Sequence, residues 1–310
     1  MNEFELIHLL TRDLPSDDSV VTGPGDDCAV IDLGLESSFL LFKTDAIVES
    51  VHFTAQTDPR RIGHKALARN LSDIAAMAGT PSHALVTLGL PESYDPQRVK
   101  DIYAGIQSLA TRHGVSIVGG ETTTNPDRLL LSIALLGRVD KDRCRHRRGA
   151  CPGDALFVSG ELGGSLDGKH LEFEPRLEEA RWLSLNWNIH SMIDLSDGLA
   201  GDLPHLLQPD HLGAELHSAS IPISRAARLR SQSGGKPPLQ AALTDGEDFE
   251  LLLTVASKDA VPLRDAWHRQ FPSLPLTCIG KIMDLPGITI RDARGVHPVT
   301  DHGYRHFQKS

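Results

Sequence analysis

The sequence contains little cysteine, no long apolar run and no secretory signal. Its four cysteines are scattered and form no C-x-x-C pair, which excludes a disulfide framework and predicts reduced thiols. No stretch of about 18 apolar residues is present, so no membrane-spanning helix is expected. The opening residues, MNEFELIHLLTRD, carry acids where a secretory signal needs bases, and no small-residue cleavage site follows. These features predict a cytoplasmic protein that does not associate with membranes.

Positive charge is also scarce. Lysine and arginine number 31 against 41 aspartates and glutamates, which gives a formal net charge of −10. A chain of this charge lacks the general attraction that holds nucleic acid, so no nucleic-acid partner is expected. With 40% hydrophobic and 23% charged residues, the composition is that of a globular chain, and 310 residues are enough for about two domains.

The common nucleotide-binding and hydrolase motifs are missing. The chain has no G-x-x-x-x-G-K-[ST], no G-x-G-x-x-G after a strand, no H-E-x-x-H and no G-x-S-x-G. Two glycine-rich segments, Gly119–Gly120 and Gly160–Gly168, permit close approach of backbone amides to a phosphate, but a flexible loop is the alternative.

Short apolar runs alternate with helical patterns, which predicts a mixed α/β or α+β fold. We expect one domain over 1–140 and another over 150–310, separated by the basic, turn-forming segment Lys141–Gly153. The predicted strands are Ser38–Lys43, Ala84–Leu90, Val115–Val118, Leu129–Val139, Ala155–Ser159 and Phe249–Val255.

The clearest helix follows Asp58. Asp58 is suited to the N-cap, Pro59 to the first helical position, and Gly79 to the end of the helix. Further helices are expected over Pro96–His113, around Arg176–Trp187, and after the acidic turn Asp194–Gly198.

Carboxylates stand at strand ends or in glycine-flanked turns, where neighbouring strands bring them together. They are Asp26, Asp27, Asp45, Glu121, Asp194 and Asp197. Asp73 differs, because it lies within the helix after Asp58, one turn beyond Asn70. Several acids in one place repel one another unless a cation intervenes, and all-oxygen ligation favours Mg²⁺, Mn²⁺ or Ca²⁺. Turn residues, N-caps and a solvated helix face are the alternatives for individual acids.

Five of the eight residues Lys141–Arg148 are basic, and Arg143, Arg145 and Arg147 share one face if the segment is extended. Arginine binds phosphate oxygens through paired hydrogen bonds, so this face suits a polyphosphate; a solvated linker is the alternative. His52 follows Asp45 by seven residues and is a candidate for contacting substrate, or else a core histidine.

An ordered set of motifs gives the chain a family resemblance. The motifs are GDDCAV, KTDAIVESVHF, KALARNLSDIAAMAG, GGETT, RRGACPGD, IDLSDGL, DGEDFEL and CIGKI. From about Gly25 onward the chain resembles the thiamine-monophosphate kinase family of the AIR-synthetase-like (PurM-like) superfamily. The resemblance implies two α+β domains, with the N-terminal domains pairing across a homodimer into a β-barrel.

The activity that this resemblance implies is direct, in-line transfer of the γ-phosphoryl group of ATP to thiamine monophosphate, the last step in making thiamine diphosphate. Several Mg²⁺ ions would assist, and no protein nucleophile or base is implied. By resemblance, the metal ligands are Asp27, Thr44, Asp45, Asp73, Glu121, Asp194 and Asp197. The implied ATP contacts are Tyr103, Gly120, Glu121, Arg147 and Ser196, and those of thiamine monophosphate are His52, Glu247 and Tyr304.

Four positions depart from the family pattern. Glu121 stands where aspartate is usual, Lys43 where a serine is common, and Asp301 and His302 where an aromatic residue often packs on the thiamine, which leaves Tyr304 as its substitute. The alternatives are another enzyme of the superfamily, such as an AIR synthetase or a selenophosphate synthetase, and a non-catalytic protein that binds nucleotide or thiamine phosphate.

Overall fold

The computed structural model describes residues 3–304, which form two compact units. One unit contains Val20–Cys144 and His170–Arg181, and we call it the six-stranded unit after its sheet. The other contains the described residues 3–19, 145–169 and 182–304, and we call it the seven-stranded unit. No helix among the described residues has the length and apolar character needed to cross a membrane.

The six-stranded sheet has the order β1-β2-β3-β6-β4-β5. Its strands are β1 Val20–Thr22, β2 Ala29–Ile31, β3 Ser38–Val48, β4 Thr80–Leu90, β5 Ser116–Thr124 and β6 Leu130–Asp140. Only β4 and β5 pair in parallel, because the helix between them returns the chain to the same end of the sheet. The remaining pairs are antiparallel.

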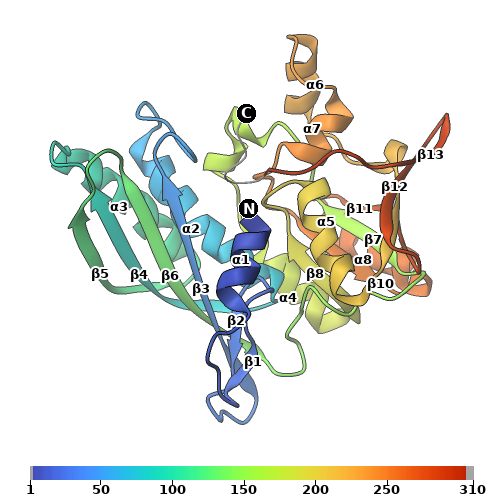
Figure 1. Ribbon diagram of the computed structural model, residues 1–310, viewed down its shortest axis with the longest axis horizontal. Coiled ribbons are helices and arrows are strands. Elements are labelled where there is room, and N and C mark those ends of the chain that lie inside the picture. Colours follow the sequence, from blue (N-terminus) through green and yellow to red (C-terminus); the bar gives the residue numbers. More distant parts are fainter. Residues whose placement is uncertain (1–2, 305–310) are drawn as a thin grey trace. The chain divides into compact units, whose positions relative to one another are not determined.

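Helices α2 (Pro59–Ala76) and α3 (Pro96–Arg112) cover one face of this sheet (Figure 1). The N-cap carboxylate of Asp58 accepts hydrogen bonds from the amides of Arg60 (2.9 Å) and Arg61 (3.1 Å), as the sequence predicts. The two helices cross closely at glycines. A Cβ on Gly63 would lie 1.9 Å from the carbonyl oxygen of Ile102, so only glycine fits there.

The opposite face of the six-stranded sheet carries apolar side chains that remain exposed. Phe42 is 45% exposed and Leu85 is 47% exposed, whereas Leu41, one residue from Phe42, is fully buried beneath the helices. This difference follows from the alternation of side chains along a strand. Val118, at a register shift in β5, is 60% exposed.

The seven-stranded sheet has the order β13-β12-β9-β11-β7-β10-β8, with β12 and β9 its one parallel pair. Its strands are β7 Ala155–Ser159, β8 Ile189–Asp194, β9 Gly213–His217, β10 Leu251–Val255, β11 Leu276–Met283, β12 Gly287–Asp292 and β13 Gly295–Pro298. Every residue of β7 and β10 is buried, which is typical of strands covered on both faces.

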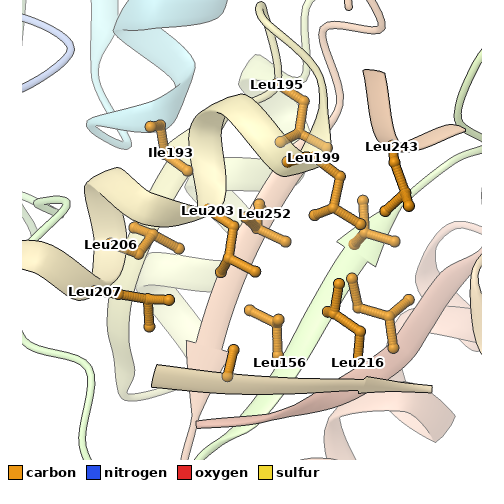
Figure 2. Packing of buried hydrophobic residues seen from close by; sticks show 14 of the residues in the cluster. Leu156, Ile193, Leu195, Leu199, Leu203, Leu206, Leu207, Leu216, Leu243 and Leu252 are labelled. Atoms are coloured by element: carbon orange, nitrogen blue, oxygen red, sulfur yellow. The ribbon is translucent and has the colours of Figure 1, made fainter. Parts of the chain in front are cut away.

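Helices pack on both faces of this sheet. Figure 2 shows leucines of α5 (Leu199–Leu207) packed toward Leu156 of β7, Leu216 of β9 and Leu252 of β10, and α7 (Pro238–Thr244) adds to this core. Elsewhere Trp182, in the middle of α4 (Leu177–Asn186), meets Trp267 of α8 (Ala260–Gln270) edge-on, with ring centroids 6.0 Å apart. Helices α1 (Glu3–Thr11) and α6 (Arg225–Gln232) are the remaining α-helices described.

The mixed α/β fold predicted from the sequence is confirmed, but three strands are longer than expected, and one of them, β4, begins earlier, at Thr80. Strand β3 continues to Val48 and β5 to Thr124, so Asp45 and Glu121 lie within strands and not at their ends. Pairing explains the extension, because Asp45 pairs with Ile133 and Glu121 pairs with Thr87.

The end of α2 also differs from the expectation. Ala78, not Gly79, adopts the left-handed conformation, with φ +56°. Gly79 is needed for another reason, since a Cβ there would lie 2.4 Å from Cδ1 of Leu41. A larger residue at position 79 would therefore displace the side chain of Leu41, which packs between α2 and β3.

The glycine crossing of α2 and α3 gives a test of the fold. Gly63→Ala forces the helices apart, and we expect it to lower the free energy of unfolding by about 1–3 kcal/mol in urea denaturation. Gly23→Ala is the matched control, because its Cβ would meet only a side-chain atom of Val20, at 3.8 Å. Equal stability of the two variants would contradict this account.

Candidate active site

In the six-stranded unit the predicted metal ligand Asp27 is buried. It follows Gly25, whose φ of +121° turns the chain sharply, and it directly precedes Cys28 and β2. Asp27 is 1% exposed, and its backbone amide donates a hydrogen bond to Oδ1 of Asp26 at 3.0 Å. A carboxylate in this position needs positive charge nearby.

Lysine 43 supplies part of that charge. Its Nζ lies 3.0 Å from Oδ1 of Asp73, which projects from α2. Burial opposes the charged form of Lys43, but the carboxylates of Asp73 and Asp45 outweigh it and raise the pKa of Lys43 above its usual value. The lysine therefore stays protonated among the predicted metal ligands.

The pKa of the Cys28 thiol is affected by the same group of carboxylates. Burial raises its pKa well above the ordinary value, and the carboxylates of Asp73, Asp27 and Asp26 raise it further, against the opposing effect of Lys43. Asp27 and Asp73 are thus brought together, as the sequence predicts.

Asp45 lies on the same helix-covered side of β3 and forms an ion pair with Arg69 of α2, at 3.0 Å. The buried Oδ1 of Asn70, the next residue, accepts no hydrogen bond within the described part of the chain. Its amide group instead donates to the carbonyl of Ala66 at 3.0 Å. Asn70 is therefore an oxygen ligand candidate that the sequence indicated only by its spacing from Asp73.

Thr44 and Glu121 face away from this acid cluster. Thr44 alternates with its neighbours on β3, and its hydroxyl lies 3.4 Å from that of Ser132 on the uncovered face. The ladder places Glu121 beside Thr87 on that same face, and three strand spacings separate it from β3, about 14 Å. Within one chain the structure does not bring Glu121 to Asp45.

Gly120 and Tyr103, both predicted ATP contacts, lie elsewhere in this unit. A Cβ on Gly120 would lie 1.8 Å from the carbonyl oxygen of Val86, so the close approach of β5 to β4 already accounts for this glycine. Tyr103 lies on α3, and partial burial raises its pKa.

His52 is held firmly in the connection after β3. Its Nδ1 accepts a hydrogen bond from the amide of Val48 at 3.0 Å, and its carbonyl accepts one from Nζ of Lys65 at 2.8 Å. Lys65 is fully buried and also lies 2.7 Å from Nδ1 of His170. Because Nδ1 of His52 is an acceptor, the neutral ring carries its proton on Nε2.

In the seven-stranded unit the acidic turn after β8 packs against the DGEDFEL segment. The amide of Glu247 donates to the carbonyl of Ser196 at 2.7 Å, and that of Phe249 donates to Leu195 at 2.8 Å. Glu247 and Phe249 have φ values of +54° and +50°, which are costly for residues other than glycine. The two hydrogen bonds to the turn hold these residues in their unfavourable conformation and so keep Glu247 beside the turn that carries Asp194 and Asp197.

A buried acid that the sequence did not single out supports this turn. Asp202 of α5 accepts a hydrogen bond from the amide of Asp197 at 2.9 Å. Burial raises the pKa of Asp202, and the carboxylates of Asp197 and Asp194 raise it further, while Arg147 lowers it. The same guanidinium, together with burial as the larger cause, lowers the pKa of His205 to about 4. Arg147, Asp194 and Asp197 are therefore close enough to interact.

Tyr304 is near the same turn. Its amide donates to the carbonyl of Asp197 at 2.9 Å, and the residue is 47% exposed. All of the predicted site residues in the seven-stranded unit lie at or beside this turn. They are Arg147, Asp194, Ser196, Asp197, Glu247 and Tyr304.

The glycine-rich loop before α4 is already occupied by protein contacts. The amide of Gly163 donates to Asp248 at 3.0 Å, and that of Gly164 donates to Asp245 at 3.1 Å. Burial raises the pKa of Asp248 to about 7. These two amides bind carboxylates of the chain itself, so the structure offers no support for a phosphate contact at Gly163 or Gly164.

Known proteins resemble this chain along nearly its whole length. Residues 25–139 match the family model described as AIR synthase related protein, N-terminal domain. A thiamine-monophosphate kinase of Rhodopirellula baltica is 42% identical over 291 residues, covering 91% of this chain and 89% of the relative.

Solved structures agree with this likeness. The structure described as AaThiL complexed with AMPPCP and TMP is 30% identical to this chain, with a TM-score of 0.84. The match covers 99% of this chain and 97% of that structure's chain. HypE of E. coli, a hydrogenase maturation protein, is 20% identical with a TM-score of 0.73; it covers 96% of each chain and shows a shared fold alone. The sequence match to a curated relative, its coverage and the grouping of the acids together show that this chain belongs to the thiamine-monophosphate kinase family.

Proposed function

We propose that this chain transfers the γ-phosphoryl group of ATP directly to the phosphate of thiamine monophosphate, with the help of Mg²⁺ ions. Membership of the family supports ATP-dependent phosphorylation of thiamine monophosphate, and a relative's structure contains AMPPCP, an ATP analogue, together with TMP. The observation that carries the proposal is that each unit gathers its own carboxylates, Asp27, Asp45 and Asp73 in one and Asp194 and Asp197 in the other.

The chain's residues fit a divalent ion with oxygen ligands. The buried Oδ1 of Asn70 accepts no hydrogen bond within the described part of the chain, so it is available to an ion. Burial is the main cause of the raised pKa of Asp202, and the carboxylates of Asp197 and Asp194 raise it further, so a cation beside these two acids would be favourable. When bound, Mg²⁺ would neutralise and align the phosphates for in-line transfer. We propose Asp27, Asp45 and Asp73, with Asp194 and Asp197, as the groups that hold it.

The acceptor phosphate needs no base, because it is ionised near neutral pH. Consistent with this, we assign no protein nucleophile and no general base. Arg147 would offset the charge that develops on the transferred group, since a guanidinium donates paired hydrogen bonds to phosphate oxygens. The remaining proposed contacts are Tyr103, Gly120 and Ser196 for ATP, and His52, Glu247 and Tyr304 for thiamine monophosphate.

Two of the chain's own cations already sit on proposed metal ligands. Lys43 pairs with Asp73 and Arg69 pairs with Asp45, each at 3.0 Å. An ammonium held there cancels charge that a metal ion would otherwise cancel. We therefore propose that this enzyme works without an ion at the position of Lys43.

The uncovered face of the six-stranded sheet supports a homodimer. Phe42, Leu85 and Val118 are exposed apolar residues, and a second copy of the sheet would bury them in the barrel that the family resemblance implies. Thr44 and Glu121 lie on this face, so any role of theirs in binding ions or ATP would be exercised at the proposed dimer interface.

The domain roles stay predictions as well. We propose that the domain expected over 1–140 is the dimerising, metal- and ATP-binding part and that the domain expected over 150–310 is its C-terminal partner, in a cytoplasmic enzyme. The six- and seven-stranded units correspond to these two domains, except that residues 3–19 belong to the seven-stranded unit and His170–Arg181 to the six-stranded unit. An AIR synthetase or selenophosphate synthetase activity has no specific observation in its favour, because the likeness to HypE extends to the fold only.

Asp73→Asn tests the proposed reaction. Loss of the carboxylate weakens metal binding, while the amide still accepts a hydrogen bond from Lys43, so we expect kcat to fall by about 100-fold or more. Thiamine diphosphate formation, followed by phosphorus NMR with ATP, Mg²⁺ and thiamine monophosphate, gives the rate. Asp127→Asn, an exposed loop change, is the control. A wild-type protein that leaves ATP unchanged would refute the activity itself.

Lys43→Ser tests the fixed-cation proposal. Without the ammonium the neighbouring carboxylates repel, so the variant should lose about 1–3 kcal/mol of stability in chelator and regain more of it with Mg²⁺ than the wild type does. Thermal unfolding with and without Mg²⁺ measures the difference. Lys43→Arg keeps the charge and should behave like the wild type; equal Mg²⁺ responses of the serine variant and the wild type would count against the proposal.

Leu85→Lys tests the dimer. A charge in the centre of the uncovered face should convert a dimer into a monomer, because burying an unpaired ammonium is costly. Sedimentation velocity measures the mass in solution. Leu229→Lys on α6, at a leucine that is 50% exposed, should leave the mass unchanged. A monomeric wild-type protein would refute this proposal without affecting the kinase assignment.

A further inference from the structure

A second group of metal-binding side chains lies in the seven-stranded unit, away from the acidic turn. Cys151 and Asp154 are in the turn before β7, and His190 is the second residue of β8. Along β8, His190 precedes Asp194 by four residues, a distance of about 13 Å. The proposed kinase reaction uses none of these three residues.

The three side chains converge. One ligand atom of each lies within 4.8 Å of the other two. Nδ1 of His190 is 2.7 Å from Oδ2 of Asp154, and the amide of Cys151 donates to that same oxygen at 2.8 Å. A tetrahedral zinc site with bonds of about 2.0–2.3 Å places its ligand atoms about 3.4–3.6 Å apart, which lies between the 2.7 Å of the His190–Asp154 pair and the 4.8 Å limit for the whole group.

The electrostatics of Asp154 point to a cation. Its side chain is 5% exposed, yet the only ion pair found for it among the described residues is with His190. A buried carboxylate is usually compensated by a permanent positive charge or by a metal ion. An imidazole supplies that charge only while it is protonated, whereas a divalent cation would supply it throughout the neutral range.

The backbone around the group is already fixed. The amide of Gly153 donates to the carbonyl of Ile282 at 2.9 Å, and the amide of Ile282 donates back to Asp154 at 2.9 Å. Gly149 packs so closely that a Cβ would lie 2.4 Å from the carbonyl oxygen of His190. A register shift in β8, between the partners of Thr254 and Val255, falls at His190, and such bulges redirect side chains.

We propose that Cys151, Asp154 and His190 bind one Zn²⁺ ion, with water as the fourth ligand. A thiolate, an imidazole and one carboxylate are the donors that zinc prefers, and a thiolate disfavours Mg²⁺ and Ca²⁺. Cys151 is exposed and the side chain of His190 is 20% exposed, so the ion can enter from solvent. Binding forms a zinc–sulfur bond and releases the thiol proton to solvent.

The bound ion would link the turn before β7 to β8. In the sheet these strands flank β10, so the link spans three neighbouring strands of the buried centre. The expected consequence is stabilisation of the seven-stranded unit, since an ion that binds the folded state only shifts the folding equilibrium toward it. This proposal is independent of the kinase reaction.

Cobalt substitution tests the site on the full-length protein. The protein is stripped with a chelator and titrated with Co²⁺, which replaces zinc and gives a sulfur-to-metal charge-transfer band in the near ultraviolet when a thiolate is bound. We expect the band to saturate at one equivalent, to persist in excess Mg²⁺, and to disappear when Zn²⁺ is added. Thermal unfolding should shift upward with one equivalent of Zn²⁺.

Matched cysteine variants identify the ligands. Cys151→Ser should abolish the band, and His190→Ala should weaken Zn²⁺ binding by at least about tenfold in competition with a chromophoric chelator. Cys278→Ser, which removes another exposed thiol, should keep both the band and the affinity. A wild-type protein without the band, or a band that survives in Cys151→Ser, would overturn the proposal; circular dichroism confirms that each variant is folded.

Discussion

Buried carboxylates constrain this molecule more than any other feature, because each must lie close to positive charge. Asp73 is paired with Lys43, Asp45 with Arg69, and the fully buried Glu250 with Lys169 at 2.7 Å. Removing a charge from water costs several kcal/mol, and an ion pair recovers that cost only with good geometry and further hydrogen bonds. Glu250 shows the pattern, since it also accepts a hydrogen bond from Ser159 at 2.8 Å.

The ion pairs also hold the carboxylates in place. The helix α2 carries both Arg69 and Asp73, and β3 carries both Lys43 and Asp45, so two ion pairs of opposite polarity join the same two elements. Helix and strand are thereby held in one relative position. A site that is arranged before its ligands arrive loses less entropy when they bind.

Local signals in the sequence are enough to predict part of the fold. Asp58 and Pro59 predicted the start of α2 correctly, since capping depends on neighbouring residues alone. The face on which Glu121 lies depends on the pairing of β5 with β4, which is a long-range property. Gly63 and Gly105 could not be interpreted from local signals for the same reason. The sequence shows only that glycine lowers helix stability, and not that the backbone of the partner helix leaves no room for a Cβ.

The ion pairs could not be predicted for a related reason. Lys43 was recognised only as a departure from the family pattern, and Arg69 not at all, because the partner of a charged side chain is decided by packing. Cys151 and His190 are far apart in the chain and come together through sheet order, so their spacing carries no motif. Residues whose role depends on the fold are thus the ones that a single sequence leaves undetected.

The fixed cations also bear on the proposed binding of metal ions and ATP by the six-stranded unit. Lys43 and Arg69 cancel part of the charge of Asp27, Asp45 and Asp73, so the cluster attracts divalent ions less strongly than the bare carboxylates would. Two phosphate-bearing substrates still repel one another and the remaining acids. Ions that arrive already bound to ATP satisfy both requirements, because they neutralise the phosphates and need only a few protein oxygens to complete their coordination. This charge balance favours a site that recognises the metal–nucleotide complex over one that first fills with free metal.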